Sequence, residues 1–170
     1  MKEFEIYDEA AEKFYRQFNF PRLPLLTSDF HQEGYQNVID LSKDLLFFNK
    51  ASKNWKESWD FKNEILEQKK VIVLTDPDLK ISYTSANLKM LNGYNPEEVL
   101  GNTPKMFQGA GTCSETSRQI GLAIKKKEAF EVKILNYKKD KSTYICHIKG
   151  FPVYNKKGKL INFIAFEAAA

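Results

Sequence analysis

Few residues of this chain are suited to metal or nucleophilic chemistry, and they form no motif. The chain has two cysteines, Cys113 and Cys146, and two histidines, His31 and His147. Their spacing matches no zinc-binding pattern, and no Ser or Cys has a His at the spacing of a nucleophile motif. We therefore expect no metal site and no enzyme activity. Two cysteines in 170 residues are also typical of a reducing, cytoplasmic compartment.

A glycine-rich stretch, GNTPKMFQGAGT at residues 101–112, is the next candidate for chemistry. Phosphate-binding loops of the P-loop type follow a strand and end in Lys-Ser or Lys-Thr, and this stretch does neither. It instead holds Met106, Phe107 and Gln108 between two groups of turn-forming residues. Two large apolar side chains in such a place are expected to face the interior of the protein.

The elements that position these residues begin with helices in residues 1–66. Apolar residues recur at helical spacing over residues 7–18, before the break NFPRLP. A second helix is expected to begin near Thr27 or Ser28, either of which could cap it. The apolar stripe of this helix is Val38, Leu41, Leu45 and Phe48. Trp55 and Trp59 are expected to head a third helix that ends near Leu66.

The pattern changes after Lys70. VIVLTDPDLKISYTS predicts a hairpin of two strands. Short helices follow: one ends at Gly93, and one has Asn95 as its cap, Pro96 in its first turn and Gly101 after its end. A longer helix, residues 114–127, has Ser114 as its expected cap. AFEVKILNY, STYICHIKGFPVY and KLINFIAFEA then predict three strands. Helices between a hairpin and a three-strand meander indicate an α+β fold with an antiparallel sheet.

The charge pattern argues against nucleic acid or a membrane as partner. The net charge is +4, and the lysine clusters KKK, KKDK and NKKGK fall in turns or at a helix end, where they favour solubility. No aromatic residues alternate with them as in a single-strand binding surface. The apolar runs are too short to span a bilayer.

Five segments in order resemble the PAS domain family, and within it the LOV (light, oxygen or voltage) branch. They are VLTDPDLKISYTS, NGYNPEEVLG, MFQGAGT, ILNYKKDKS and INFIAFE. The resemblance implies a PAS fold over residues 67–170, with a five-stranded antiparallel sheet and short helices on one face. Residues 1–66 would be an N-terminal helical extension.

The resemblance also implies a ligand cavity between the sheet and the helices of residues 85–126. Met106 and Phe107 would cover it, and Gln108 would either point at a ligand or be a polar residue at a helix end. The expected ligand-binding residues are Thr75, Phe107, Gln108, Asn136, Cys146, Ile148, Phe163 and Glu167. Ile120 is also expected to line the cavity.

The resemblance does not extend to every flavin-binding position. The cysteine that bonds to flavin in photoactive LOV domains corresponds to Pro104, so we expect no cysteinyl-flavin adduct. Gly121 replaces a phosphate-binding basic residue, with Arg118 one turn earlier. Cys146 replaces a ring-binding asparagine, and Glu167 replaces a glutamine, where a buried carboxylate is costly. The ligand therefore stays open, with FMN as one candidate. Haem is not expected, because the helix at residues 114–127 contains no His.

Alternation along the strands assigns residues to the two faces of the sheet. The cavity face has Phe130, Val132, Ile134 and Asn136 on one strand, Tyr144, Cys146, Ile148 and Gly150 on the next, and Ile161, Phe163, Ala165 and Glu167 on the last. The outer face is also apolar, so it must be covered. Its residues are Leu135, Tyr137, Ile145, His147, Phe151, Val153, Ile164 and Phe166. The cover would be the N-terminal helices or a second subunit, and His147 is expected to be a hydrogen-bonded packing residue.

Together these features favour a non-catalytic sensory or signalling module. It would bind a small molecule in the cavity, or a signalling protein or a second copy of itself through the outer sheet face and the N-terminal helices. The alternative is a flavin-binding, LOV-like protein without adduct photochemistry.

Overall fold

The structure, a computed structural model, describes residues 28–170, with side chains from residue 36 onward. The helix predicted over residues 7–18 lies outside the described residues. Asn37–Ala170 form one compact unit. The predicted domain boundary at residue 66 stays a prediction, and residues 37–66 belong to the same compact unit as the sheet.

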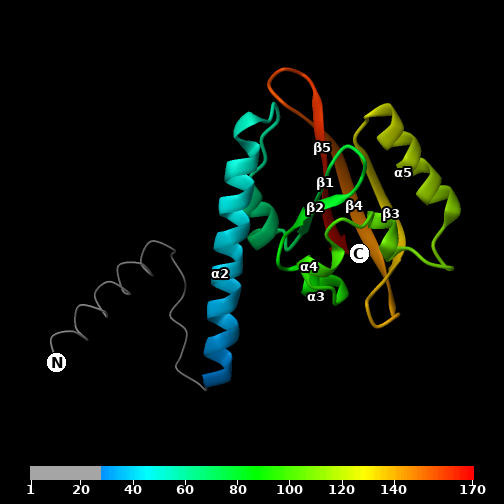
Figure 1. Cartoon of the computed structure of the whole chain (residues 1–170). Helices are drawn as coiled ribbons and strands as arrows, with labels where there is room; N and C mark the ends of the chain where they lie inside the picture. Colours follow the sequence, from blue (N-terminus) through cyan, green and yellow to red (C-terminus); the bar gives the residue numbers. More distant parts are fainter. Residues whose placement is uncertain (1–27) are drawn as a thin grey trace, which may run out of the picture. The chain divides into compact units, whose positions relative to one another are not determined.

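The centre of this unit is a five-stranded sheet (Figure 1). Its strands are β1 (Val71–Thr75), β2 (Ile81–Thr84), β3 (Phe130–Tyr137), β4 (Thr143–Tyr154) and β5 (Leu160–Ala169). They lie in the order β2-β1-β5-β4-β3, and every neighbouring pair is antiparallel. The α+β fold with a five-stranded antiparallel sheet is thus confirmed. All five residues of β1 are buried, because both faces of this strand are covered.

Short helices connect the hairpin to β3. They are α3 (Leu88–Asn92), α4 (Pro96–Val99), the 3-10 turn η3 (Pro104–Phe107) and α5 (Ser114–Lys126). Gly93 ends α3 with a positive φ of 82°, which costs glycine little. Asn95 precedes α4, and its N–H donates to Glu98 Oε2 at 2.8 Å, as the capping pattern predicted.

Two local predictions were wrong. Ser114 is the first residue of α5, and Cys113, with an extended backbone, occupies the cap position. The second error concerns Trp55 and Trp59, which are not helical: Trp55 forms an isolated bridge with Asn155, and a π-helical turn, η2, spans Asn63–Glu67. The tryptophan rings instead meet edge to face at 5.8 Å. Their spacing therefore reflects packing of two rings on one apolar cluster.

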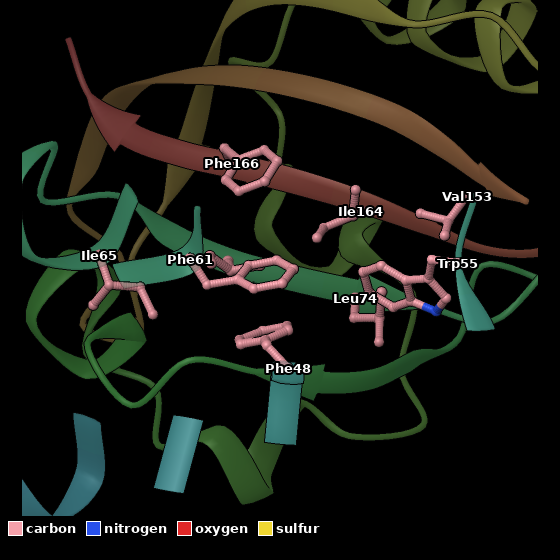
Figure 2. Packing of buried hydrophobic residues seen from close by; sticks show 9 residues of the cluster. Phe48, Trp55, Phe61, Ile65, Leu74, Val153, Ile164 and Phe166 are labelled. Atoms are coloured by element: carbon pink, nitrogen blue, oxygen red, sulfur yellow. The ribbon is translucent and has the colours of Figure 1, made fainter. Parts of the chain in front are cut away.

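The second predicted helix is α2 (Ser28–Ala51), which begins at the expected residue. Its C-terminal part and residues 55–65 cover the outer face of β1 and β5 (Figure 2). We call this outer cluster the α2 cluster. Its buried members are Phe48, Trp55, Phe61, Ile65, Ile72, Leu74, Val153, Ile164 and Phe166.

The α2 cluster confirms that N-terminal helical residues cover the outer face over β1, β5 and the end of β4.

Over the start of β4 the outer face is less covered, and Ile145 is 42 % exposed. Here Glu131 Oε1 lies 2.8 Å from His147 Nε2 and 3.1 Å from Lys149 Nζ. His147 is thus hydrogen-bonded, as predicted. These contacts hold the pKa of Glu131 below its usual range, with Lys149 as the larger cause.

One residue changes face relative to the alternation pattern. Between β4 and β5 the pairing moves from Val153–Asn162 to Tyr154–Leu160, so β5 contains one additional residue, Ile161. A bulge of this kind turns the strand locally. Ile161 therefore packs against the α2 cluster, and its assignment to the cavity face was wrong. Phe163, Ala165 and Glu167, beyond the bulge, line the cavity as predicted.

Candidate ligand-binding cavity

A cavity of about 340 Å³ lies between the sheet and α5. Strand residues form the floor of the cavity. The turn at residues 76–79 (DPDL) and η3 form further parts of its wall. α5 contributes Ser117, Ile120, Gly121 and Ile124. None of the residues of α5 is fully buried, so this helix stands over the sheet without filling the space beneath it. The volume is within the range of small-molecule pockets.

Residue size controls how much of this space stays open. A Cβ on Gly121 would meet nothing within 4 Å, so glycine leaves room at the α5 wall. The opposite holds at Gly150, where a Cβ would lie 2.3 Å from the Phe130 ring. The Phe130 ring therefore covers Gly150, and this part of the cavity face is already filled.

Polar side chains gather on the cavity face of β3, β4 and β5. Asn136 and Glu167 both line the cavity, and each is only 3 % exposed. Cys146 is a diagonal neighbour of both in the sheet register, because Asn136 pairs with Tyr144 and Glu167 pairs with Ile148. Its Sγ donates to Glu167 Oε2 at 3.7 Å. We call Asn136, Tyr144, Cys146 and Glu167 the polar cluster.

The polar cluster is incompletely hydrogen-bonded. Asn136 Oδ1 and the Tyr144 hydroxyl are buried without a hydrogen-bond partner. Burial raises the pKa of Glu167 to about 7 against the opposing effect of the Cys146 thiol. Burial, and secondarily the neighbouring Glu167, also raises the pKa of Cys146. Unsatisfied polar atoms on a cavity wall are atoms that a ligand can pair with.

Residues 69–167, more than half of the chain, match the family described as PAS domain. The chain belongs to the PAS domain family. This PAS domain is similar to Protein TWIN LOV 1 of Arabidopsis thaliana, with 34 % identity over 98 residues, which is 55 % of this chain and 25 % of that protein. It is also similar to Phototropin-2 of Oryza sativa subsp. japonica, with 29 % identity over 113 residues, 65 % of this chain and 12 % of that protein.

A bacterial relative is the blue-light-activated histidine kinase of Brucella canis, with 32 % identity over 89 residues, 52 % of this chain and 18 % of that protein. The aligned region is thus a quarter or less of the length of these three relatives. Among solved structures, the light state of the blue-light photoreceptor Aureochrome1 LOV superposes with a TM-score of 0.58 and 26 % identity, covering 66 % of this chain and 89 % of that chain. The PAS domain is therefore a LOV-type sensory domain related to blue-light photoreceptors.

The structure brings most of the predicted ligand-binding residues of the PAS domain onto one cavity. Among the described residues, Cys146 is the exception: it belongs to the polar cluster but is not part of the cavity wall. Gln108 lines the cavity and accepts a hydrogen bond from Ser117 Oγ at 2.9 Å, which links η3 to α5. The residues on the wall are Thr75, Phe107, Gln108, Ile120, Asn136, Ile148, Phe163 and Glu167.

Sequence reasoning missed Tyr144 of the polar cluster and four polar residues of the cavity wall, namely Asp78, Thr103, Lys105 and Ser117. Tyr144 was assigned to the cavity face but not to the site, although alternation already placed it beside Asn136. Asp78 and Lys105 also line the cavity. Both lie in turns, where no periodic pattern indicates the direction of a side chain, so only the packing of the turns could place them.

The described residues hold no group of three or more His, Cys, Asp or Glu side chains that could bind a metal ion. Both cysteines are free, Cys113 exposed and Cys146 buried. Within the described part of the chain, no helix has the length and hydropathy needed to cross a membrane.

Proposed function

We propose that this PAS domain is a non-catalytic sensory module whose cavity binds a small molecule. The observation that carries the proposal is the 340 Å³ cavity with a buried acceptor atom, Asn136 Oδ1, that has no protein donor. A ligand group would pair with this atom, while Phe107, Ile148 and Phe163 would contact its apolar part. Cavities of this kind, mostly apolar with a few convergent polar groups, are typical of ligand sites.

The proposed output is a change in α2. Asp44 of α2 accepts hydrogen bonds from the Tyr83 hydroxyl at 2.8 Å and from the Ala86 N–H at 2.9 Å. Phe47 stacks on the Tyr83 ring with centroids 3.5 Å apart. Because β2 pairs with β1, whose other face lines the cavity, a shift of β1 on ligand binding would reach α2 through Tyr83.

The test is direct analysis of the purified protein. Mass spectrometry of the molecule released on denaturation, together with the visible absorption spectrum, should identify a bound ligand. Replacing Gly121 with Phe should fill the α5 side of the cavity and abolish the binding, whereas Lys157→Phe, in the exposed β4–β5 turn, should not. Equal binding by both variants would place the ligand elsewhere and overturn the proposal.

FMN is the second candidate ligand, supported by the LOV-type relatives and by Thr75, Gln108 and Asn136, which agree with the family pattern. In that case we propose that light forms no cysteinyl adduct, because Pro104 stands where the reactive thiol would be. Protein reconstituted with FMN should keep its flavin absorption band under blue light. Reversible loss of that band, abolished by Cys113→Ala, would contradict the proposal.

The signalling partner would bind the outer sheet face, where β3 and the start of β4 are less covered than β1 and β5. Ile145 is the most exposed apolar residue there. We propose a signalling protein or a second copy of this chain as the partner, in the cytoplasm, and not nucleic acid or a membrane. Replacing Ile145 with Glu should weaken self-association in analytical ultracentrifugation if the partner is a second copy.

A further inference from the structure

Two of the three lysine clusters of the sequence meet at one end of the sheet. KKK, residues 125–127, lies at the C-terminal end of α5, and NKKGK, residues 155–159, forms the β4–β5 turn. In Figure 1 both lie at the same end of the sheet, beside the residues that follow α2. The third cluster, KKDK at residues 138–141, lies in the β3–β4 turn at the opposite end. The fold therefore gathers charges that are far apart in the sequence.

Hydrogen bonds to the backbone hold these segments together. The Tyr154 carbonyl accepts from the Lys56 N–H at 2.8 Å, and the Tyr154 hydroxyl donates to the Lys127 carbonyl at 3.5 Å. The Lys156 N–H donates to the Asn54 carbonyl at 3.0 Å. The positions of the lysines are thus fixed by contacts between main chains and do not depend on the lysine side chains.

We call residues 53–57, 125–128 and 154–159 the basic end. Its only acidic residues are Glu57 and Glu128. The basic end therefore carries a larger positive charge than the whole chain, whose net charge is +4. Its lysines are all exposed, and they are Lys53, Lys56, Lys125, Lys126, Lys127, Lys156, Lys157 and Lys159.

Within the described part of the chain, the lysines of the basic end form no ion pair. Elsewhere Lys70, Lys139 and Lys149 each pair with a glutamate. The C-terminus of α5 favours nearby cations through the helix dipole, but this effect does not reach the other two segments. Solubility requires exposed charge, but not its concentration at one end of the molecule. Like charges gathered without partners repel one another and destabilise the fold, and a bound anionic partner would remove that repulsion.

We propose that the basic end is a docking surface for an acidic segment of a partner protein. Carboxylates of such a segment would supply the negative charges that the lysines lack. Because backbone contacts already fix the three segments, little ordering of the main chain is required on binding. This surface is separate from the ligand cavity and from Ile145, which lies at the other end of β4.

Other anionic partners fit the basic end less well. It presents no exposed aromatic ring on which bases could stack, since Trp55 is buried and Tyr154 is half-buried. It contains no arginine, whose planar fork matches phosphate groups best. It also has no exposed large apolar residue that could enter a bilayer. An acidic protein segment needs none of these features, because carboxylates pair with the ammonium groups alone.

The test is the fluorescence anisotropy of a labelled octaglutamate peptide, titrated with the full chain at about 50 mM salt, where screening is weak. The triple variant Lys53→Gln/Lys156→Gln/Lys157→Gln should weaken binding at least about tenfold, because it removes charges that face the peptide. Failure of the full chain to bind the peptide would overturn the inference.

The matched control removes the same charge from the other end of the sheet. Lys138→Gln/Lys139→Gln/Lys141→Gln in the β3–β4 turn should weaken binding less than about threefold, since only the long-range field changes. Equal weakening by the two triple variants would overturn the inference.

A measurement without variants locates the peptide. Octaglutamate should shift the backbone amide NMR signals of residues 53–57 and 154–159 and leave those of residues 138–141 in place. Shifts confined to other regions would contradict the proposed surface.

Two further probes distinguish the class of partner. A DNA duplex of random sequence and vesicles that contain phosphatidylserine should respond equally to the two triple variants, as expected for non-specific attraction. Binding of either probe that is lost only in the variant of the basic end would assign this surface to nucleic acid or to a membrane, and the inference would be wrong.

Discussion

α2 and α5 lie against opposite faces of the sheet (Figure 1) and differ in how they are packed. Phe48 of α2 is completely buried against Phe61, with ring centroids 4.7 Å apart. α5 has no fully buried residue and borders a cavity instead. The difference indicates that apolar packing fills the outer face under α2, whereas a cavity occupies the part of the inner face beneath α5. The rest of the inner face has a buried cluster of its own, which includes Leu88, Val99 and Phe107.

The largest expected effect is loss of packing under α2. Phe48→Ala should destabilise the protein by about 3–5 kcal/mol, because it removes a buried ring and leaves a cavity. The matched change on the other face, Ile124→Ala on α5, should cost under about 1 kcal/mol, since this side chain borders a space that is already open. Chemical denaturation measures both, and similar losses would contradict the contrast between the two faces.

The second effect is the pH dependence caused by Glu167. Its folded pKa of about 7 lies above the unfolded value of 4.5, so between these pH values the folded state binds more protons than the unfolded state. The stability of the ligand-free protein should therefore fall as pH rises from about 4.5 to about 7, by about 3 kcal/mol in total. Glu167→Gln should remove this slope between about pH 5 and about pH 8, and Glu131→Gln should keep it.

A third, smaller effect concerns the hydrogen bonds that join α2 to the sheet. Tyr83→Phe removes the donor to Asp44 and should cost about 1–2 kcal/mol, because it leaves a buried carboxylate oxygen without one of its partners. Burial already raises the pKa of Asp44. Unfolding of Tyr83→Phe in urea, compared with Tyr154→Phe near the β4–β5 turn, checks this. Equal costs would mean that Tyr83 contributes mainly through its ring.

The smallest effect is expected on the barer part of the outer face. Ile145→Thr should change stability by less than about 0.5 kcal/mol, because this side chain is 42 % exposed. Val153→Thr on the same strand, which is completely buried in the α2 cluster, should cost clearly more. Thermal denaturation of the two variants compares the less covered and the covered parts of the outer sheet face. A large loss of stability in Ile145→Thr would show that the part around Ile145 is also covered.

The strands and turns were largely predictable from sequence, because alternation and turn residues are local signals. Asn95 and Gly93 are examples, since each acts within one turn of its own helix. The bulge at Ile161 was not predictable, because it depends on the pairing between β4 and β5. The non-helical spacing of Trp55 and Trp59 likewise depends on packing against Phe61 and Phe151.

The candidate site was predictable to a similar degree. Alternation and the family resemblance placed Asn136 and Glu167 on one face. A raised pKa and a basic partner were the two alternatives for a buried Glu167, and its burial in the structure raises the pKa to about 7. Asp44 was missed altogether. A lone acidic residue beside an apolar stripe is usually solvated, and its partners, Tyr83 and the Ala86 N–H, are about forty residues away in sequence.

The absence of buried side chains on α5 has a consequence for the motion of this helix. Its backbone hydrogen bonds are protected by few apolar contacts, so its amide hydrogens should exchange with deuterium sooner than those of β1, whose five residues are all buried. A molecule in the cavity would add contacts along Ile120 and Ile124 and slow that exchange. Deuterium uptake of α5 would then report occupancy of the cavity, even for a ligand that neither absorbs light nor fluoresces.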